Sequence, residues 1–206
     1  MEPISIILIA LVLVVPWIIL FIIMSGSNKK TIKNFKKLEE KYGLQGDYSK
    51  KVGMKTHPSS RGVYRSRNIK IESIIRDSVE GKKVISHTML IVECSNTDNF
   101  TFLAVKRKRQ NNASFLTGSS LLNDNEFDDK YILQTNNIEK LRNIFDFNTK
   151  FKLDQVHKLG FDGIIKLDNN YLVYIEKGLL NNDESLMRME LVMHELCDIA
   201  DVMKYN

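Results

Sequence analysis

The most prominent feature of the hydrophobic pattern is an uncharged apolar stretch near the N-terminus. It runs from Ile4 to Met24 and contains Pro16 but no charged residue. At about 1.5 Å of rise per residue, a helix of that length extends roughly 31 Å, which is the hydrocarbon thickness of a bilayer. The pattern therefore predicts an N-terminal single transmembrane helix followed by a separate domain.

The charges that flank this stretch predict its orientation. Glu2 is the only charged side chain before it, whereas five lysines follow it closely: Lys29, Lys30, Lys33, Lys36 and Lys37. Positive charge next to a membrane span favours the cytoplasmic side. We therefore expect a single-pass protein of the cell membrane, with the N-terminus outside and the C-terminal domain in the cytoplasm. A cleaved signal peptide is the alternative, although the first three residues lack the usual positive charge.

Residues 29–44 show the spacing of an amphipathic helix. Ile32, Phe35, Leu38 and Tyr42 share one face, and Gly43 is a typical helix stop. Two interpretations remain open: a helix lying in the plane of the lipid headgroups, or a stalk helix packed on the domain. The polar residues that follow predict a linker. We thus divide the chain into an anchor (1–24), a basic juxtamembrane helix with a linker (25–60) and a cytoplasmic α+β domain (61–206).

Beyond residue 60 the hydrophobic period changes to two, which is typical of β-strands. Between Val84 and Cys94 the alternate residues on one face are all small or apolar. Further strands are expected near 63–75, 100–109 and 131–133. Residues 164–178 predict a hairpin that turns at Asp168-Asn169-Asn170, where asparagine tolerates a positive φ.

Three segments show helical spacing. Two short helices are expected over residues 136–145 and 148–159, and a long one over 183–204. The last has an apolar stripe wider than a coiled-coil seam, which favours packing on a sheet, with a homodimer through this helix left open. The predicted fold class is α+β: a mostly antiparallel β-sheet domain with a helical excursion and a C-terminal packing helix. A pleckstrin-homology-like barrel is the alternative, and the inserted helices count against it.

Composition adds two limits. The net charge is +5, which suits an anionic surface such as lipid or RNA. The two cysteines, Cys94 and Cys197, are too few for a secreted scaffold built on disulfides.

One cluster resembles a helical zinc motif without completing it. His194 and Asp198 lie four residues apart with Glu195 between them, but the motif requires a second histidine at the position of Asp198. The sequence also lacks a phosphate-binding glycine loop and a Cys-x-x-Cys pair. We therefore predict no catalytic, cofactor-binding or metal-binding residue and no cofactor, and we lean towards a protein that is not an enzyme.

Several segments together resemble an uncharacterised prokaryotic family of membrane-associated proteins, which carry a domain of unknown function. The similarity covers roughly residues 60–180. It is carried by the acidic segment 124–131 that enters a strand, by the hairpin strand 168–175, and by the upstream segment 62–65. The resemblance implies an architecture and no particular chemistry.

The functional prediction is a non-enzymatic cytoplasmic docking module that binds an unknown protein partner beside the lipid bilayer. The alternative is a module that binds anionic lipid, and an unrecognised enzyme is the third hypothesis. Nucleic acid is a disfavoured partner, because the basic residues are not interleaved with aromatic ones. The residues predicted to contact anionic lipid or phosphate are Lys29, Lys30, Lys33, Lys36, Lys37, Lys106, Arg107, Lys108 and Arg109.

Overall fold

A single antiparallel sheet forms the centre of the computed structural model, which describes residues 3–52, 55–77, 84–96, 98–107, 122, 124–160 and 163–205. Its eight strands are β1 (Gln45–Asp47), β4 (Ser59–Tyr64), β5 (Arg67–Asp77), β6 (Val84–Glu93), β7 (Phe102–Lys106), β8 (Tyr131–Thr135), β9 (Gly163–Asp168) and β10 (Tyr171–Lys177). They follow the order β1-β4-β5-β6-β10-β9-β7-β8, and β2 (Lys51–Val52) pairs with β3 (Lys55–Thr56) separately. The sheet therefore interleaves strands that are distant in the sequence.

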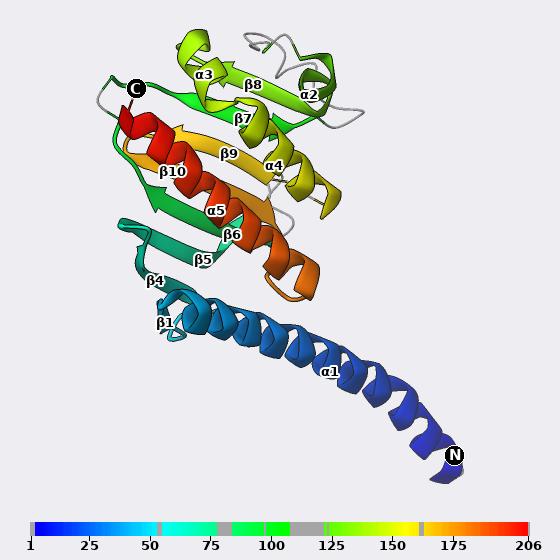
Figure 1. Ribbon diagram of the computed structural model, residues 1–206. Helices are drawn as coiled ribbons and strands as arrows, with labels where there is room; N and C mark the ends of the chain where they lie inside the picture. Colours follow the sequence, from blue (N-terminus) through cyan, green and yellow to red (C-terminus); the bar gives the residue numbers. More distant parts are fainter. Residues whose placement is uncertain are drawn as a thin grey trace.

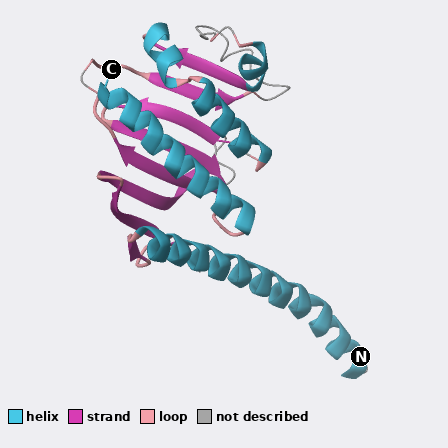
Figure 2. Cartoon of the chain, in the orientation of Figure 1, coloured by secondary structure: helices cyan, strands magenta, loops and turns pink. Residues whose placement is uncertain are grey.

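The helices are distributed unevenly around this sheet. They are α1 (Pro3–Tyr42), α2 (Asn125–Lys130), α3 (Ile138–Ile144), α4 (Phe147–Lys158) and α5 (Asp183–Tyr205). Figure 1 shows α3, α4 and α5 on the same face of the sheet, with α1 running past the β1 edge and away from it. The same view coloured by secondary structure shows two layers, one of helices and one of strands (Figure 2).

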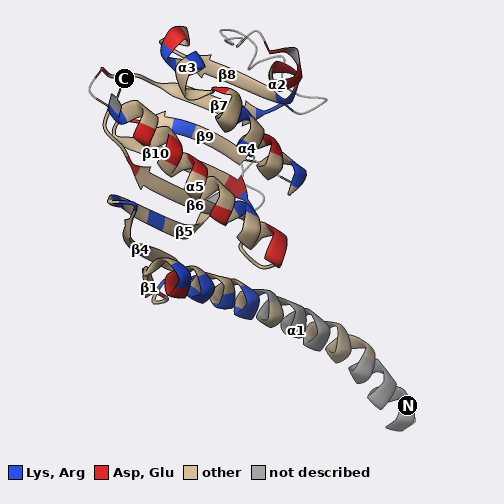
Figure 3. Cartoon of the chain, viewed as in Figure 1, with Lys and Arg blue, Asp and Glu red and all other residues tan. Residues whose placement is uncertain are grey.

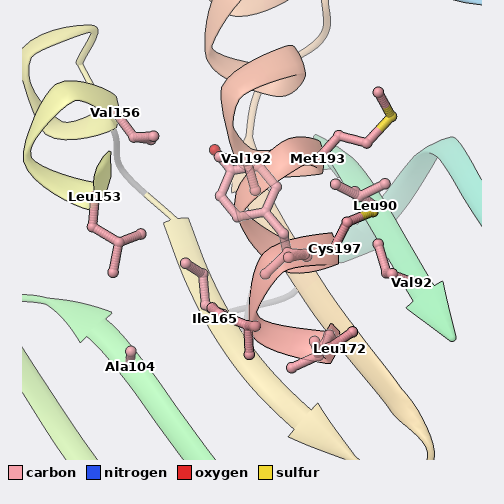
Figure 4. Close-up of a cluster of buried hydrophobic side chains, with 14 of the residues drawn as sticks. Leu90, Val92, Ala104, Leu153, Val156, Ile165, Leu172, Val192, Met193 and Cys197 are labelled. Carbon is pink, nitrogen blue, oxygen red and sulfur yellow. The ribbon is translucent and has the colours of Figure 1, made fainter. Parts of the chain in front are cut away.

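The main core lies between α5 and the central strands β6 and β10. Leu90 and Val92 of β6, and Leu172 and Tyr174 of β10, are completely buried. Successive side chains of a strand point to opposite faces, so these alternate residues all face α5. Figure 4 shows Leu90, Val92 and Leu172 beside the following side chains of α5: Val192, Met193 and Cys197. The apolar stripe of the terminal helix therefore covers the sheet.

A buried polar network also joins α5 to β10. The Arg188 Nε donates to Glu176 Oε2 at 2.6 Å, and the Tyr174 hydroxyl donates to the same oxygen at 2.7 Å. Arg188 also donates to the carbonyl oxygen of Leu159, at the end of α4. Because Glu176 is only 3% exposed, these donors replace the water that its carboxylate loses on folding.

The second half of α1 packs on the domain. Phe35 and Leu38 are fully buried, and the Asn34 side chain donates to the carbonyl oxygen of Leu180 at 3.0 Å. The helix ends at Gly43, whose φ of +67° is the left-handed conformation that favours glycine. Of the two interpretations of residues 29–44, the structure therefore supports a helix packed on the domain.

The predicted transmembrane helix is wrong. Residues 4–24 belong to α1, which continues past Met24 without a break to Tyr42. In the part of the chain that the structure describes, no helix is both long enough and apolar enough to cross a membrane. The prediction relied on the absence of charge over one stretch, whereas that stretch is part of a longer helix whose other half carries the lysines. The single-pass location in the cell membrane, with an outer N-terminus and a cytoplasmic domain, was inferred from this span and is wrong with it.

The α+β class that the sequence predicted agrees with the structure. The observed sheet is open, since β1 and β8 end its strand order, so the described chain does not form a pleckstrin-homology-like barrel. Residues 45–60, which we interpreted as a linker, contain β1, β2 and β3 and the first residues of β4.

Candidate functional site

The face of the sheet opposite α5 is the strongest candidate for a functional surface. Among the described helices, α3, α4 and α5 lie on the other face (Figure 1), and none lies over the centre of this one. Antiparallel sheets with one solvated face usually carry polar side chains there. Here the central strands instead place Met89, Ile91, Val173 and Ile175 on it.

The strand register arranges these apolar residues in rows across the sheet. Ile91 pairs with Val173, and Met89 pairs with Ile175. The four side chains form the floor of a groove of about 970 Å³, which we call the open-face groove. Val173 and Ile175 are each 7% exposed, and Met89 and Ile91 are partly exposed.

Basic residues border this floor on both sides. Lys70 pairs with Ile91 in the register, and Lys166 pairs with Val173. One row across the sheet therefore consists of Lys70, Ile91, Val173 and Lys166, with a basic residue at each end. Arg61, which pairs with Lys70, extends this row by one strand. Lys70 and Lys166 form ion pairs with Glu72 (2.7 Å) and Asp168 (2.6 Å), which are partly exposed and hence weak. The groove thus combines an apolar floor with ion-paired basic and acidic side chains at its edges.

The backbone beneath the groove has no free hydrogen-bonding groups to offer. β6 is paired with β5 on one side and with β10 on the other, and β10 is paired in turn with β9. A molecule that binds here must therefore be recognised through side chains.

The predicted basic site does not come together in the structure. Lys29, Lys30, Lys33, Lys36 and Lys37 lie on α1, beside the β1 edge (Figure 3). Lys106 ends β7 and Arg107 follows it, whereas Lys108 and Arg109 lie outside the described residues. β1 and β7 are six strand spacings apart in the sheet, which is about 29 Å at ~4.8 Å each. These residues form two separate groups.

Some of the predicted contact residues make contacts within the protein. Lys37 lies 3.4 Å from Asp183 of α5, and Arg107 donates to the carbonyl oxygen of Asp128 at 3.0 Å. These residues help to hold α1 and α2 in position.

The residues of the incomplete zinc motif contact other side chains of the protein. The ring nitrogens of His194 lie 3.3 Å and 3.0 Å from the hydroxyls of Tyr42 and Tyr64. Asp198 instead pairs with Arg65 at 2.5 Å, and the Glu195 carboxyl is buried against α4. Burial lowers the pKa of His194. Glu195 and Asp198 both lie beside Lys152 of α4, whereas His194 contacts the two tyrosines. The described residues include no group of side chains that could hold a metal ion.

The two cysteines are buried in the core. Cys94 is 5% exposed and Cys197 is fully buried, and burial raises the pKa of each thiol to about 11. The thiolate is the reactive form, so a rise of two pKa units from 9 lowers its fraction about 100-fold at neutral pH.

We expect neither thiol of the folded protein to react with Ellman's reagent at pH 8, and both to react after unfolding in urea. The free amino acid provides the reference rate. Rapid reaction of one thiol in the folded chain would contradict this burial.

Sequence reasoning missed the open-face groove. The sequence did carry a signal for it. In both VISHTMLIVE and YLVYIEK, large apolar residues occur among the side chains on each of the two faces of the strand. The more apolar set of alternate residues in 84–94 was predicted to be the buried face, whereas the structure shows that the other set forms part of the groove floor.

The fold defines the chain as an α+β protein in which one face of an antiparallel sheet is covered by helices and the other carries an apolar groove. No family model and no curated protein matches the sequence. Among solved structures, the chain is similar to the crystal structure of the mycobacterial trehalose monomycolate transport factor A, TtfA. The TM-score is 0.50 at 13% sequence identity, and the match covers 83% of this chain and 94% of that one. This similarity concerns the fold alone.

Proposed function

We propose that this chain is a non-enzymatic docking module that binds a partner protein on the open face of its sheet. The observation that carries the proposal is the uncovered apolar floor formed by Met89, Ile91, Val173 and Ile175. Contiguous apolar surface in a concave site is typical of a binding surface. The structural neighbour is named a transport factor rather than an enzyme, and this name is compatible with a binding role.

The alternative of anionic-lipid recognition has less support. It required the lysines of α1 and the basic residues after β7 to act together, and these groups lie at different places along the sheet. Many of the other charged side chains are paired within the protein, such as Arg67 with Asp201 at 2.7 Å.

A photo-crosslinking experiment tests the docking proposal. Tyr171 lines the groove and is 47% exposed, so replacing it with a photoreactive phenylalanine analogue leaves the core unchanged. Irradiation of cells that express the full-length variant is expected to yield a discrete crosslinked protein of defined mass. Mass spectrometry then identifies the partner.

The matched control places the same analogue at Leu191 on α5. Leu191 is 40% exposed and lies on a helix that covers the opposite face of the sheet. The proposal requires a product at Tyr171 that is absent at Leu191. If both positions give the same products or neither gives any, the open face is not a docking surface.

A further inference from the structure

The open-face groove and the first half of α1 are two apolar surfaces that the described part of the chain leaves uncovered. We infer that they bind each other between two copies, so that residues 4–24 of one copy lie as a helix in the groove of the other. This inference rests on the proposed docking function, and it names a second copy of the chain as the docking partner.

The first half of α1 is apolar on every side. Residues 4–24 carry no charge, and Val12, Leu13 and Trp17 are 66%, 64% and 74% exposed. Val14 and Val15 are also exposed, and four consecutive residues of a helix point to all sides of it. A helix that is apolar all round is normally buried, so this segment requires a surface to cover it.

This segment does not reach the groove of its own copy. α1 is continuous from Pro3 to Tyr42, and the buried side chains of Phe35 and Leu38 hold its second half on the domain. Figure 1 shows the first half running away from the sheet. If α1 occupies the groove, it therefore comes from a second copy.

The groove and the segment agree in size. As a helix, residues 4–24 extend about 31 Å, and the seven residues of β10 extend about 24 Å. The borders on β5 and β9 are three strand spacings apart, about 14 Å, and a helix with its side chains is about 10–12 Å wide. A helix also satisfies its own backbone groups, as the fully paired strands beneath the groove require.

The charges around the groove suit an uncharged occupant. The three rows of side chains that carry the floor contain as many basic as acidic residues: Arg61, Lys70, Lys166, Glu72, Glu93 and Asp168. Lys70 and Lys166 are paired with Glu72 and Asp168, and the Asn68 side chain donates to Glu93. A charged helix would compete with these pairs, whereas residues 4–24 leave them intact.

A reciprocal exchange covers all of these surfaces at once. Under two-fold symmetry each copy gives its α1 and receives the α1 of the other, and the assembly closes at two chains. Two contacts of roughly 24 Å by 10 Å, each counted on both surfaces, bury about 1,000 Å², which reaches the size of a specific interface. We therefore expect a dimer.

Paired cysteines test this contact in cells that express the full-length chain. Two differently tagged copies are produced together. One carries Lys70→Cys or Lys166→Cys, at the two borders of the groove. The other carries a single cysteine at each of these exposed positions of α1 in turn: Val12, Leu13, Val15 and Trp17. We expect oxidation to join the copies through a disulfide, seen on a non-reducing gel as a product with both tags.

The helical repeat gives this experiment an internal control. Val12 and Val15 share one side of α1, and Leu13 and Trp17 share the other. For a given border, one of these pairs should form at least tenfold more product than the other. The matched control places the second cysteine at Leu191, which is 40% exposed on α5, and should give no product above background.

Charge on α1 provides a second measurement. Light scattering of the purified full-length chain is expected to give the mass of two copies. The double substitution Leu13→Glu and Trp17→Glu should reduce it to one, because the groove would have to bury two charges. Met187→Glu, at a position of α5 that is 55% exposed, is the control and should leave the dimer intact. Circular dichroism verifies that both variants are folded.

The outcomes separate this inference from the docking proposal itself. Disulfides that do not follow the helical repeat, disulfides between two α1 cysteines alone, or a mass that Leu13→Glu and Trp17→Glu do not change overturn the exchanged helix. If the photo-crosslink at Tyr171 yields a different protein while no disulfide forms between copies, docking stands and the second copy is the wrong partner. If neither experiment gives a product, both proposals fail.

Discussion

Replacing Arg188 by methionine is expected to lower the free energy of unfolding by about 3–5 kcal/mol. The guanidinium is the basic partner of Glu176, with an Nε–Oε2 distance of 2.6 Å, and their side chains are only 12% and 3% exposed. Methionine fills similar space but leaves the carboxylate buried and without its counter-charge. An unpaired buried charge costs far more than the pair contributes, because water cannot replace the lost partner.

Urea denaturation followed by circular dichroism measures this effect through the transition midpoint. The control is Lys37→Met, which removes the exposed ion pair with Asp183 and should change stability by less than about 1 kcal/mol. The double variant Arg188→Met with Glu176→Leu should recover much of the loss, since it also removes the stranded carboxylate. A loss for Arg188→Met as small as that of Lys37→Met would show that the pair is not buried in solution.

The second large effect is a dependence of stability on pH that Glu195 produces. Its carboxyl is 1% exposed between α5 and α4, and burial raises its pKa from 4.5 to about 7. Lys152 Nζ lies 3.4 Å from Oε2 and offsets this rise only in part. The folded protein therefore holds the proton of Glu195 more tightly than the unfolded chain does.

The sign of the effect follows from this difference in proton affinity. The contribution of Glu195 is fully present below pH 4.5 and is lost as the pH rises through about 7. The rise of the Glu195 pKa from 4.5 to about 7 corresponds to about 3 kcal/mol of stability between these limits. Replacing Glu195 by glutamine removes the charge, so the variant should be more stable than the parent at pH 8 and similar to it near pH 4.5.

Urea unfolding of both proteins at several pH values between 4.5 and 8 measures this difference. Subtracting the free energy of unfolding of one protein from that of the other at each pH removes the contribution of the titratable groups that both proteins contain. Glu40→Gln, an exposed position on α1, is the control and should leave the profile parallel to that of the parent. Parallel profiles for Glu195→Gln as well would mean that this carboxyl is not buried in the folded state.

Much of the fold could be predicted because its longer elements have clear periods. The stripe of the terminal helix predicted both its range and its packing on the sheet, and Asn169 has the positive φ (52°) that its turn required. Helix starts were less certain. We expected the second short helix to begin at residue 148, whereas α4 begins at Phe147 and the Asp146 side chain accepts the backbone hydrogen bond of Thr149 at 2.8 Å.

Short strands and long-range pairing could not be predicted from local patterns. β1, β2 and β3 have two or three residues each, too few for alternation to be visible. The groove depends on β6 pairing with β10 and β9 with β7, and no local signal specifies which strands become neighbours. The sequence identified the two groups of basic residues, but the distance between them depends on the strand order, which the sequence did not predict.

The strand order also constrains how this chain folds during synthesis. β5 and β6 form an antiparallel pair early, but the next neighbour of β6 is β10, which ends at Lys177. Roughly 80 residues must leave the ribosome between the two strands, which takes about 4–16 s at ~5–20 residues per second. During that interval the inner edge of β6 is unpaired and its apolar residues are exposed. The nascent chain therefore carries an exposed strand edge, a surface open to wrong pairing, until β10 has been made.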